Sequence, residues 1–269
     1  MSTMEFIKKL RDMSGAGMVD CQKAFKESDN DLDKALELLR KKGIMKAAKR
    51  ADRDATEGII KLAVSADNKI GYILQISSET DFVARNEKFL NFANTTIELA
   101  TINHPANLDE FNALKMSDGN TIKDNLDSLS GIIGEKLSVE KYDMVKTEGT
   151  VAVYSHAQGR IGVLVALDKA EAIDIAKDIA MQVAAANPKY ITSSEVPQAE
   201  IDKEKEIYRE QLAKEGKPAN ILENILAGKV NKYFQDICLV DQEFIKDEKV
   251  KISNLLGAIK VEKMIRYSL

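Results

Sequence analysis

The first 43 residues carry apolar side chains at the three-to-four-residue spacing of amphipathic helices. Ser2 and Glu5 match the capping box that starts a helix, and Gly15 to Gly17 interrupts the pattern after one such helix. A second helix is expected from Met18 to Lys26, and the polar run Ser28 to Asp31 should cap a third. The pattern therefore predicts a compact unit of three helices. Its apolar positions include Phe6, Ile7, Leu10, Leu32, Ala35, Leu36 and Leu39.

Gly43 stands where a helix commonly ends in a left-handed glycine, so we expect the third helix to stop there. Residues 44–56 then place basic side chains among alanines, a composition that is most typical of a solvated helical linker. A short contact strip for an acidic partner surface is the alternative. The basic residues of this segment are Lys46, Lys49, Arg50 and Arg53.

After this linker the apolar period changes to two, which indicates strands. Residues 57–76 alternate around an Asp67-Asn68 turn and predict a hairpin. A helix is expected from Asp81 to about Ala100, and His104-Pro105 should end it. The next predicted elements are a helix over residues 108–137 and a strand over residues 139–145.

The hairpin pattern returns later in the chain at a constant offset. Gly58 and Gly149 lie 91 residues apart, as do Gly71 and Gly162. The strand after each turn is apolar in both copies, and each copy is followed by a predicted helix that ends at a proline. We infer an internal repeat of about 90 residues, which implies a duplicated core. The two prolines are Pro105 and Pro188.

The two copies differ in length between strand and helix. Ile76 to Pro105 spans 29 positions, whereas Leu167 to Pro188 spans 21, so the first copy carries eight extra residues. They fall in or near Ser77 to Asn86. Because the second copy does without them, the fold does not require them. A longer loop with an aromatic residue, Phe82, at its turn suggests a projection used for contact.

Residues 198–234 interrupt the second half with two charge-rich helical patterns, and Gly216-Lys217-Pro218 should form the turn between them. This segment predicts a protruding antiparallel helical hairpin. Residues 237–245 and 264–269 are expected to add strands to the second sheet. The predicted fold class is α+β. The predicted domains are a helical module with its linker (residues 1–55), a first core repeat (56–145) and a second core repeat (146–269) that contains the hairpin.

Composition supports folded domains and narrows the choice of partner. Hydrophobic residues make up 44% and charged residues 30% of the 269 positions, which suits solvated modules with apolar cores. A net charge of −4 argues against a direct nucleic-acid partner, because proteins that bind phosphates are usually basic. The chain shows neither the apolar core of a signal peptide nor a run long enough for a membrane span. We therefore expect a cytoplasmic protein without a membrane partner.

The sequence contains no pattern that indicates catalysis or metal binding. Cys21 and Cys238 lie far apart among apolar residues, which is typical of buried thiols in a reducing compartment. His104 and His156 are the only histidines, and their spacing matches no metal site or catalytic triad. Nothing singles out a pair among the 43 acidic residues, so paired carboxylates stay open. We expect no enzymatic activity, no cofactor and no metal site.

Four segments resemble the translation elongation factor Ts family. Gly15 to Cys21 and Leu39 to Gly43 are similar to its N-terminal module, a three-helix fold like the ubiquitin-associated (UBA) domain. Thr80 to Asn86 is similar to its signature loop, and Gly159 to Val165 to its second core half. The helical hairpin has its place in the family too, and the resemblance covers nearly the whole chain in order.

The resemblance implies a guanine nucleotide exchange factor that acts by binding alone. Its partner would be elongation factor Tu, in the GDP-bound and nucleotide-free states. By match, Asp81 and Phe82 would intrude near the Mg²⁺ and phosphate site of the partner, and Thr80 and Val83 would position them. This loop would thereby promote the release of GDP.

Met18 and Val19 would lie on the contact face of the N-terminal module, although they could instead pack inside the small bundle. Phe82 taken alone is more often a core residue than a wedge, but the extra residues of its loop favour the wedge. Two other functions stay open, a ubiquitin-type adaptor or other protein-binding scaffold, and an enzyme of unknown class. The protruding hairpin could also support a homodimer.

Overall fold

The computed structural model describes residues 2–214 and 219–269, which form two compact units. Helices accompany antiparallel sheets, so the predicted α+β class is confirmed. The domain boundaries that the sequence suggests, after residues 55 and 145, stay a prediction. Unit 1 consists of residues 1–63, 72–144 and 268–269, and unit 2 of residues 64–71 and 145–267.

Three helices form the N-terminal module of unit 1: α1 (Thr3–Ser14), α2 (Met18–Glu27) and α3 (Leu32–Ala48). Ser2 and Glu5 form the predicted capping box, in which each side chain accepts the backbone N–H of the other residue. The three helices enclose a common apolar core, which confirms the predicted three-helix unit. Its buried residues are Ile7, Leu10, Cys21, Ala24, Phe25, Ala35 and Leu39.

The prediction that α3 ends at Gly43 is wrong, because the helix continues to Ala48. Gly43 lies inside α3, where that helix packs against α7 (Ile122–Ile133). A Cβ atom on Gly131 of α7 would lie only 2.5 Å from the Cα atom of Gly43. The glycine therefore permits close helix packing, which offsets its helix-propensity cost of about 1 kcal/mol.

The first sheet has the strand order β1-β2-β3, formed by β1 (Glu57–Val64), β2 (Ile70–Ser78) and β3 (Leu137–Lys146). β1 and β2 are the predicted hairpin, and β3 is the strand predicted over residues 139–145. The single helix expected from Asp81 is interrupted at Arg85 and Asn86, so that a short helix, α4 (Asp81–Ala84), precedes α5 (Glu87–Asn103). The helix α5 ends just before Pro105, as expected.

The segment after α5 is not the single helix predicted for residues 108–137. It forms α6 (Leu108–Ala113), a loop and then α7. The break has a local cause, since Lys115 and Thr121 pair as an isolated bridge and Gly119 between them has a φ of 80°. Residues other than glycine rarely adopt such a φ, so the helix cannot continue through this loop.

The second sheet, in unit 2, has the strand order β4-β5-β8, formed by β4 (Thr150–His156), β5 (Ile161–Leu167) and β8 (Val261–Ser268). The strands β4 and β5 pair antiparallel. The helix α8 (Ile173–Ala186) packs against both of them through a shared aliphatic core and ends before Pro188, as predicted. β8 contains most of the strand predicted over residues 264–269.

The two hairpins share a detail that supports the internal repeat. A Cβ atom on Gly58 would lie 2.1 Å from the carbonyl oxygen of Ile76. One on Gly149 would lie 2.0 Å from the carbonyl oxygen of Leu167. The two pairs are offset by the same 91 residues. Glycine is therefore required at the same point of each copy, where two backbone segments approach each other closely.

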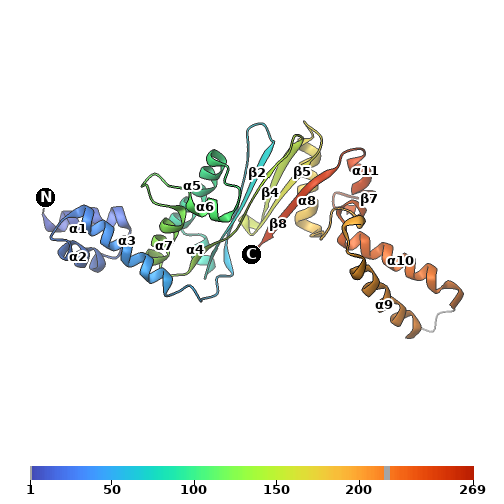
Figure 1. Ribbon diagram of the computed structural model, residues 1–269, viewed down its shortest axis with the longest axis horizontal. Coiled ribbons are helices and arrows are strands. Elements are labelled where there is room, and N and C mark those ends of the chain that lie inside the picture. Colours follow the sequence, from blue (N-terminus) through green and yellow to red (C-terminus); the bar gives the residue numbers. More distant parts are fainter. Residues whose placement is uncertain (1, 215–218) are drawn as a thin grey trace. The chain divides into compact units, whose positions relative to one another are not determined.

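The helices α9 (Gln198–Lys214) and α10 (Ala219–Ile237) pack side by side and extend away from the second sheet (Figure 1), which confirms the predicted helical hairpin. The turn predicted at Gly216-Lys217-Pro218 lies outside the described residues.

One carboxylate ties the base of this hairpin together. Glu200 of α9 accepts hydrogen bonds from Lys189 Nζ (2.8 Å) and from the hydroxyls of Tyr190 (2.9 Å) and Tyr233 (2.6 Å). Tyr233 belongs to α10, whereas Lys189 and Tyr190 precede α9. We call these four residues the Glu200 anchor. It joins both helices of the hairpin to the segment that leaves α8.

The strand predicted over residues 237–245 is wrong for most of its length. Ile237 still belongs to α10, and only β6 (Glu243–Phe244) is a strand. It pairs with β7 (Asp247–Lys251) in a separate two-stranded sheet. The apolar Leu239 instead packs into the core beneath α8. The remaining short elements are α11 (Ile252–Leu256) and 3-10 turns at Ala157–Gly159, Ser193–Glu195 and Leu239–Asp241.

Candidate functional site

Of the eight extra residues of the first copy, five lie between Ile76 and α5, and the other three lengthen α5 relative to α8. The longer connection forms a short helical turn, α4 (Asp81–Ala84), between β2 and α5. Thr80 caps this turn, because its backbone is extended and its hydroxyl oxygen accepts the N–H of Val83 at 3.5 Å. Asn86 caps α5 directly afterwards by accepting the N–H of Lys88. In the second copy no helix lies between β5 and α8, so α4 is the structural form of the predicted projecting loop.

Phe82 is the most exposed large hydrophobic residue in the described chain, with 84% of its surface accessible to solvent. Its neighbour Val83 is only 8% exposed and belongs to the core. Leaving a phenyl ring in water forgoes roughly 1.5–3 kcal/mol of burial free energy. The alternative that Phe82 is a core residue is therefore excluded, and the ring is free to contact another molecule.

The start of the turn is held by Glu135. Thr80 donates its backbone N–H to Glu135 Oε2 (3.0 Å) and its hydroxyl to Glu135 Oε1 (2.7 Å). Asp81 accepts a hydrogen bond from Arg85 at 3.0 Å, and both of these side chains face solvent. Exposed ion pairs of this kind are worth little, so the Asp81 carboxylate can exchange Arg85 for a new partner at low cost. The sequence reasoning missed Glu135, which lies 55 residues from Thr80 and carries no motif.

On the N-terminal module, Met18 and Val19 open α2 directly after Gly17. Val19 is 62% exposed and Met18 is 36% exposed, whereas Cys21, one turn further on, is fully buried. Both predicted contact residues therefore lie on the outer surface of the bundle and do not pack inside it. They present a small apolar face that could bind another protein.

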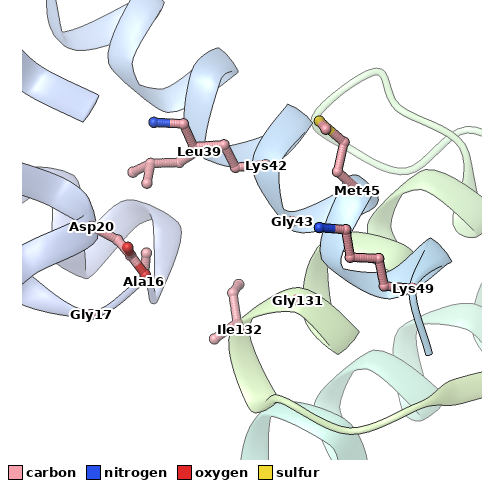
Figure 2. Close-up of a pocket in the computed structure, with 10 residues that line it drawn as sticks. All are labelled: Ala16, Gly17, Asp20, Leu39, Lys42, Gly43, Met45, Lys49, Gly131 and Ile132. Carbon is pink, nitrogen blue, oxygen red and sulfur yellow. The ribbon is translucent and has the colours of Figure 1, made fainter. Parts of the chain in front are cut away.

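A hollow of about 240 Å³ lies in unit 1 beside Gly17 (Figure 2). Its walls come from the start of α2, from α3 and from α7, and they combine the apolar Met45 and Ile132 with the charged Asp20 and Lys49. Small-molecule sites usually exceed roughly 300 Å³. The hollow is therefore smaller than most small-molecule sites, and it lies beside the start of α2, the helix that begins with Met18 and Val19.

The basic segment after Gly43 is only partly a linker. Its first residues belong to α3, and Lys49 is exposed beyond the end of that helix. Arg50 donates to the carbonyl oxygen of Ser130 (3.4 Å), and Arg53 pairs with Glu79. The chain itself thus uses two of the four basic residues. The side chain of Lys46 lies outside the described part of the structure.

The two histidines form hydrogen bonds with tyrosines. His104 contacts the Tyr72 hydroxyl at 2.5 Å, and His156 contacts that of Tyr154 at 3.4 Å. Within residues 2–214 and 219–269, no group of three or more His, Cys, Asp or Glu residues is placed to hold a metal ion. No helix in those ranges is long and apolar enough to cross a membrane.

The two cysteines are free and buried, as their apolar surroundings predict. Burial, together with nearby carboxylates, raises the pKa of the Cys238 thiol to about 11. A thiol with such a pKa is protonated at neutral pH and is a poor nucleophile. It therefore fits a packing role.

Comparison with known proteins gives a consistent result. The family model "Elongation factor TS" matches residues 79–269. Elongation factor Ts of Clostridium perfringens (strain SM101 / Type A) is 41% identical over 99% of this chain and 92% of its own length. Elongation factor Ts of Chlorobaculum parvum is 42% identical, and that of Chloroherpeton thalassium 40%, each over 98% of this chain and 96% of its own length. The chain belongs to the elongation factor Ts family.

Proposed function

We propose that this protein is a guanine nucleotide exchange factor for elongation factor Tu. The observation that carries the proposal is the solvent-exposed ring of Phe82 on a turn that the second copy of the repeat lacks. Family membership supports a part in translation elongation. The protein binds the GDP form of its partner, accelerates GDP release and changes no covalent bond.

The turn from Thr80 to Val83 acts on the Mg²⁺ that the partner holds with its nucleotide. Magnesium requires a near-octahedral shell of oxygen ligands and bridges the nucleotide phosphates. Phe82 enters as an apolar wedge that displaces a ligand or a water molecule from this shell. Asp81 brings a carboxylate, a ligand type that Mg²⁺ prefers, next to the same site. A small displacement of the ion then weakens GDP binding.

The magnitude fits a single aromatic contact. Burying the Phe82 ring in the partner is worth roughly 1.5–3 kcal/mol. Since about 1.4 kcal/mol of differential binding corresponds to a tenfold change in affinity, this residue accounts for a tenfold to hundredfold effect. Linkage is reciprocal, so GDP must lower the affinity of elongation factor Tu for the exchange factor by the same factor by which the exchange factor lowers its affinity for GDP. The protein therefore forms a stable nucleotide-free complex that added nucleotide dissociates.

Met18 and Val19 provide a second contact, which anchors the N-terminal module on the partner. Their exposed side chains support this assignment. A homodimer through the helical hairpin and a cytoplasmic location stay predictions. The ubiquitin-type adaptor is the competing function, and titration of labelled ubiquitin into the full chain distinguishes the two. We expect no binding of ubiquitin.

The test is the release of a fluorescent GDP analogue from elongation factor Tu. Phe82→Ala should slow factor-stimulated release at least tenfold and leave the far-ultraviolet circular dichroism unchanged. Ile102→Ala is the matched control, since Ile102 is another exposed large apolar residue of unit 1 but lies at the end of α5. Wild-type release rates with Phe82→Ala would reject the proposed mechanism.

A further inference from the structure

Two loop segments of unit 1 exchange hydrogen bonds through their glutamates. Before α4, the N–H of Thr80 donates to Glu135 Oε2 at 3.0 Å. Between α7 and β3, the N–H of Lys136 donates to Glu79 Oε1 at 2.6 Å. Each glutamate thus accepts the backbone N–H of the residue that follows the other glutamate. We call this reciprocal arrangement the carboxylate clasp.

Both bonds of the clasp are charge-assisted, which makes them roughly twice as strong as bonds between neutral groups. Arg53 also holds Glu79 in place, because it donates hydrogen bonds to both carboxylate oxygens, at 3.2 and 3.3 Å. The Lys136 N–H and, to a smaller extent, Arg53 hold the pKa of Glu79 below its ordinary value, against the opposing effect of burial. Glu79 is therefore ionised at neutral pH, and its hydrogen bond from the Lys136 N–H is formed.

The other half controls the cap of α4. The Thr80 hydroxyl has a single proton, and it donates that proton to Glu135 Oε1 at 2.7 Å. Its oxygen lone pairs are then free to accept the N–H of Val83. A helix of four residues is not stable without such support, because helix nucleation is unfavourable. Glu135 thus orients the group that starts the turn.

The orientation of the Phe82 side chain follows from this arrangement. Consecutive residues of a helical turn point about 100° apart, and Phe82 lies between the capping Thr80 and the buried Val83. Fixing Thr80 and Val83 fixes the backbone of the turn between them, and with it the direction in which the Phe82 side chain leaves the backbone. We propose that Glu135 is a positioning residue for nucleotide exchange, which through Thr80 holds the Phe82 ring in its outward orientation before the partner arrives. This inference rests on the proposed function.

The helix that precedes Glu135 does not need its carboxylate. Gly134 (φ 92°) ends α7 and donates its N–H to the carbonyl oxygen of Ser130 at 2.9 Å. The carboxylate of Glu135 instead reaches across to the α4 turn. Glu135→Gln should therefore free the turn and leave α7 and β3 in place. An amide in this position presents an N–H₂ group to the Thr80 donors, so it cannot replace both bonds.

The first experiment observes the turn directly and needs no partner. Because the chain contains no Trp, Phe82→Trp introduces a unique indole at the site, which can be excited selectively beside the tyrosines. Time-resolved anisotropy of this introduced indole should show little fast local motion when Glu135 is present, and at least a doubled fast amplitude when Glu135→Gln is added. Glu98→Gln, at an exposed position of α5, removes the same charge and should change nothing. Equal anisotropy decays with and without Glu135→Gln would overturn the proposal.

The second experiment measures exchange with Phe82 retained. Glu135→Gln should lower the maximal GDP release rate between about twofold and tenfold, the cost of ordering one side chain on binding. The concentration for half-maximal stimulation should change less, since the N-terminal contacts remain. Glu79→Gln should act in the same direction. Thr80→Val and Glu135→Gln should be non-additive, because both remove the same bond.

These arms separate the clasp from the proposed function. If even the wild-type chain fails to stimulate release while Glu135→Gln mobilises the introduced indole, the clasp stands and the exchange function falls. If wild type stimulates release and Glu135→Gln changes neither the anisotropy nor the maximal rate, the positioning role falls. A loss that appears only as a smaller folded fraction in circular dichroism, with Thr80→Val and Glu135→Gln additive, also rejects positioning.

Discussion

The two copies of the repeat carry their additions at different places. The first copy inserts the four-residue α4 between its strand and its helix, whereas the second copy passes from β5 to α8 without it. The second copy instead inserts the long hairpin of α9 and α10 after its helix. In each addition a glutamate accepts hydrogen bonds that fix it to a neighbouring segment. This glutamate is Glu135 for α4 and Glu200 for the hairpin.

This difference distinguishes the residues that the fold requires from those that serve contact with a partner. The strand-helix packing of the second copy shows that this packing forms without an intervening turn. The α4 turn is too short to be stable alone, and it leaves Phe82 in water. The hairpin has two full helices that pack on each other. The α4 turn therefore gains less stability from its own packing than the helical hairpin does. Elements that bind a partner are expected to be among the less stable parts of a fold.

The largest effect should come from the equivalent glycines of the two copies. We expect Gly58→Ala and Gly149→Ala each to cost more than about 3 kcal/mol of stability, because the new Cβ would meet a backbone carbonyl that cannot move aside. Urea unfolding followed by circular dichroism measures the loss. Gly119→Ala is the control, since an alanine at its φ of 80° would be strained but would meet only open space, and it should cost roughly 1–2 kcal/mol.

Losses at both Gly58 and Gly149 that exceed the loss of Gly119→Ala would confirm that the two hairpins share this close approach. The loss at Gly58 should be the larger, because its φ of 145° would also strain an alanine. A loss at either glycine no larger than that of Gly119→Ala would show that the close approach relaxes easily. The equivalence of the two copies would then fail at this point.

The second prediction removes the α4 turn that distinguishes the first copy from the second. Residues 77–86 are replaced by the five-residue connection Asp168 to Ala172 of the second copy. We expect GDP release to fall at least about hundredfold, because the whole contact turn is lost along with the phenyl ring. Fluorescent-GDP release measures the effect, and far-ultraviolet circular dichroism should show nearly unchanged helix content.

A chimera that keeps more than a tenth of the wild-type exchange rate would place the essential contact elsewhere in the chain. An unfolded chimera would show that the first copy has come to depend on its insertion. That outcome would contradict the separation of fold and contact drawn above.

Periodicity and the repeat predicted most of the architecture from the sequence. The three-helix module, both hairpins, the helical hairpin and the exposed turn at Phe82 all depend on local pattern or on a count of positions. Gly43 misled the prediction, because an internal glycine and a terminal one look alike until the partner helix is known. The strand predicted at 237–245 failed since an apolar run fits a buried turn as well as a strand.

The anchoring residues could not be predicted. Glu135 and Thr80 are 55 positions apart, and Glu200 and Tyr233 are 33 apart. Glutamate is common on protein surfaces, so neither residue carries a local signal. Only the folded backbone brings these donors and acceptors together, and long-range hydrogen bonds of this kind leave no periodic trace.

The smallest predicted effect concerns acid and the Glu200 anchor. Lys189, followed by the hydroxyls of Tyr233 and Tyr190, lowers the pKa of Glu200 to about 2 from an ordinary 4.5. Because the unfolded chain takes up this proton first, the contribution of Glu200 is fully present above about pH 5. It is lost as pH falls toward 2. Because Lys189 is exposed to solvent, screening keeps this contribution of Glu200 to stability small.

Glu200→Gln should therefore lower the urea midpoint at pH 7, and the gap to wild type should narrow at pH 3. Glu206→Gln, which removes a charge from an exposed position of the same helix, should show neither change. A gap that stays constant between the two pH values would mean that the carboxylate charge does not matter to the anchor. The hairpin would then be held by the packing of α9 on α10, and only the α4 turn would depend on a glutamate.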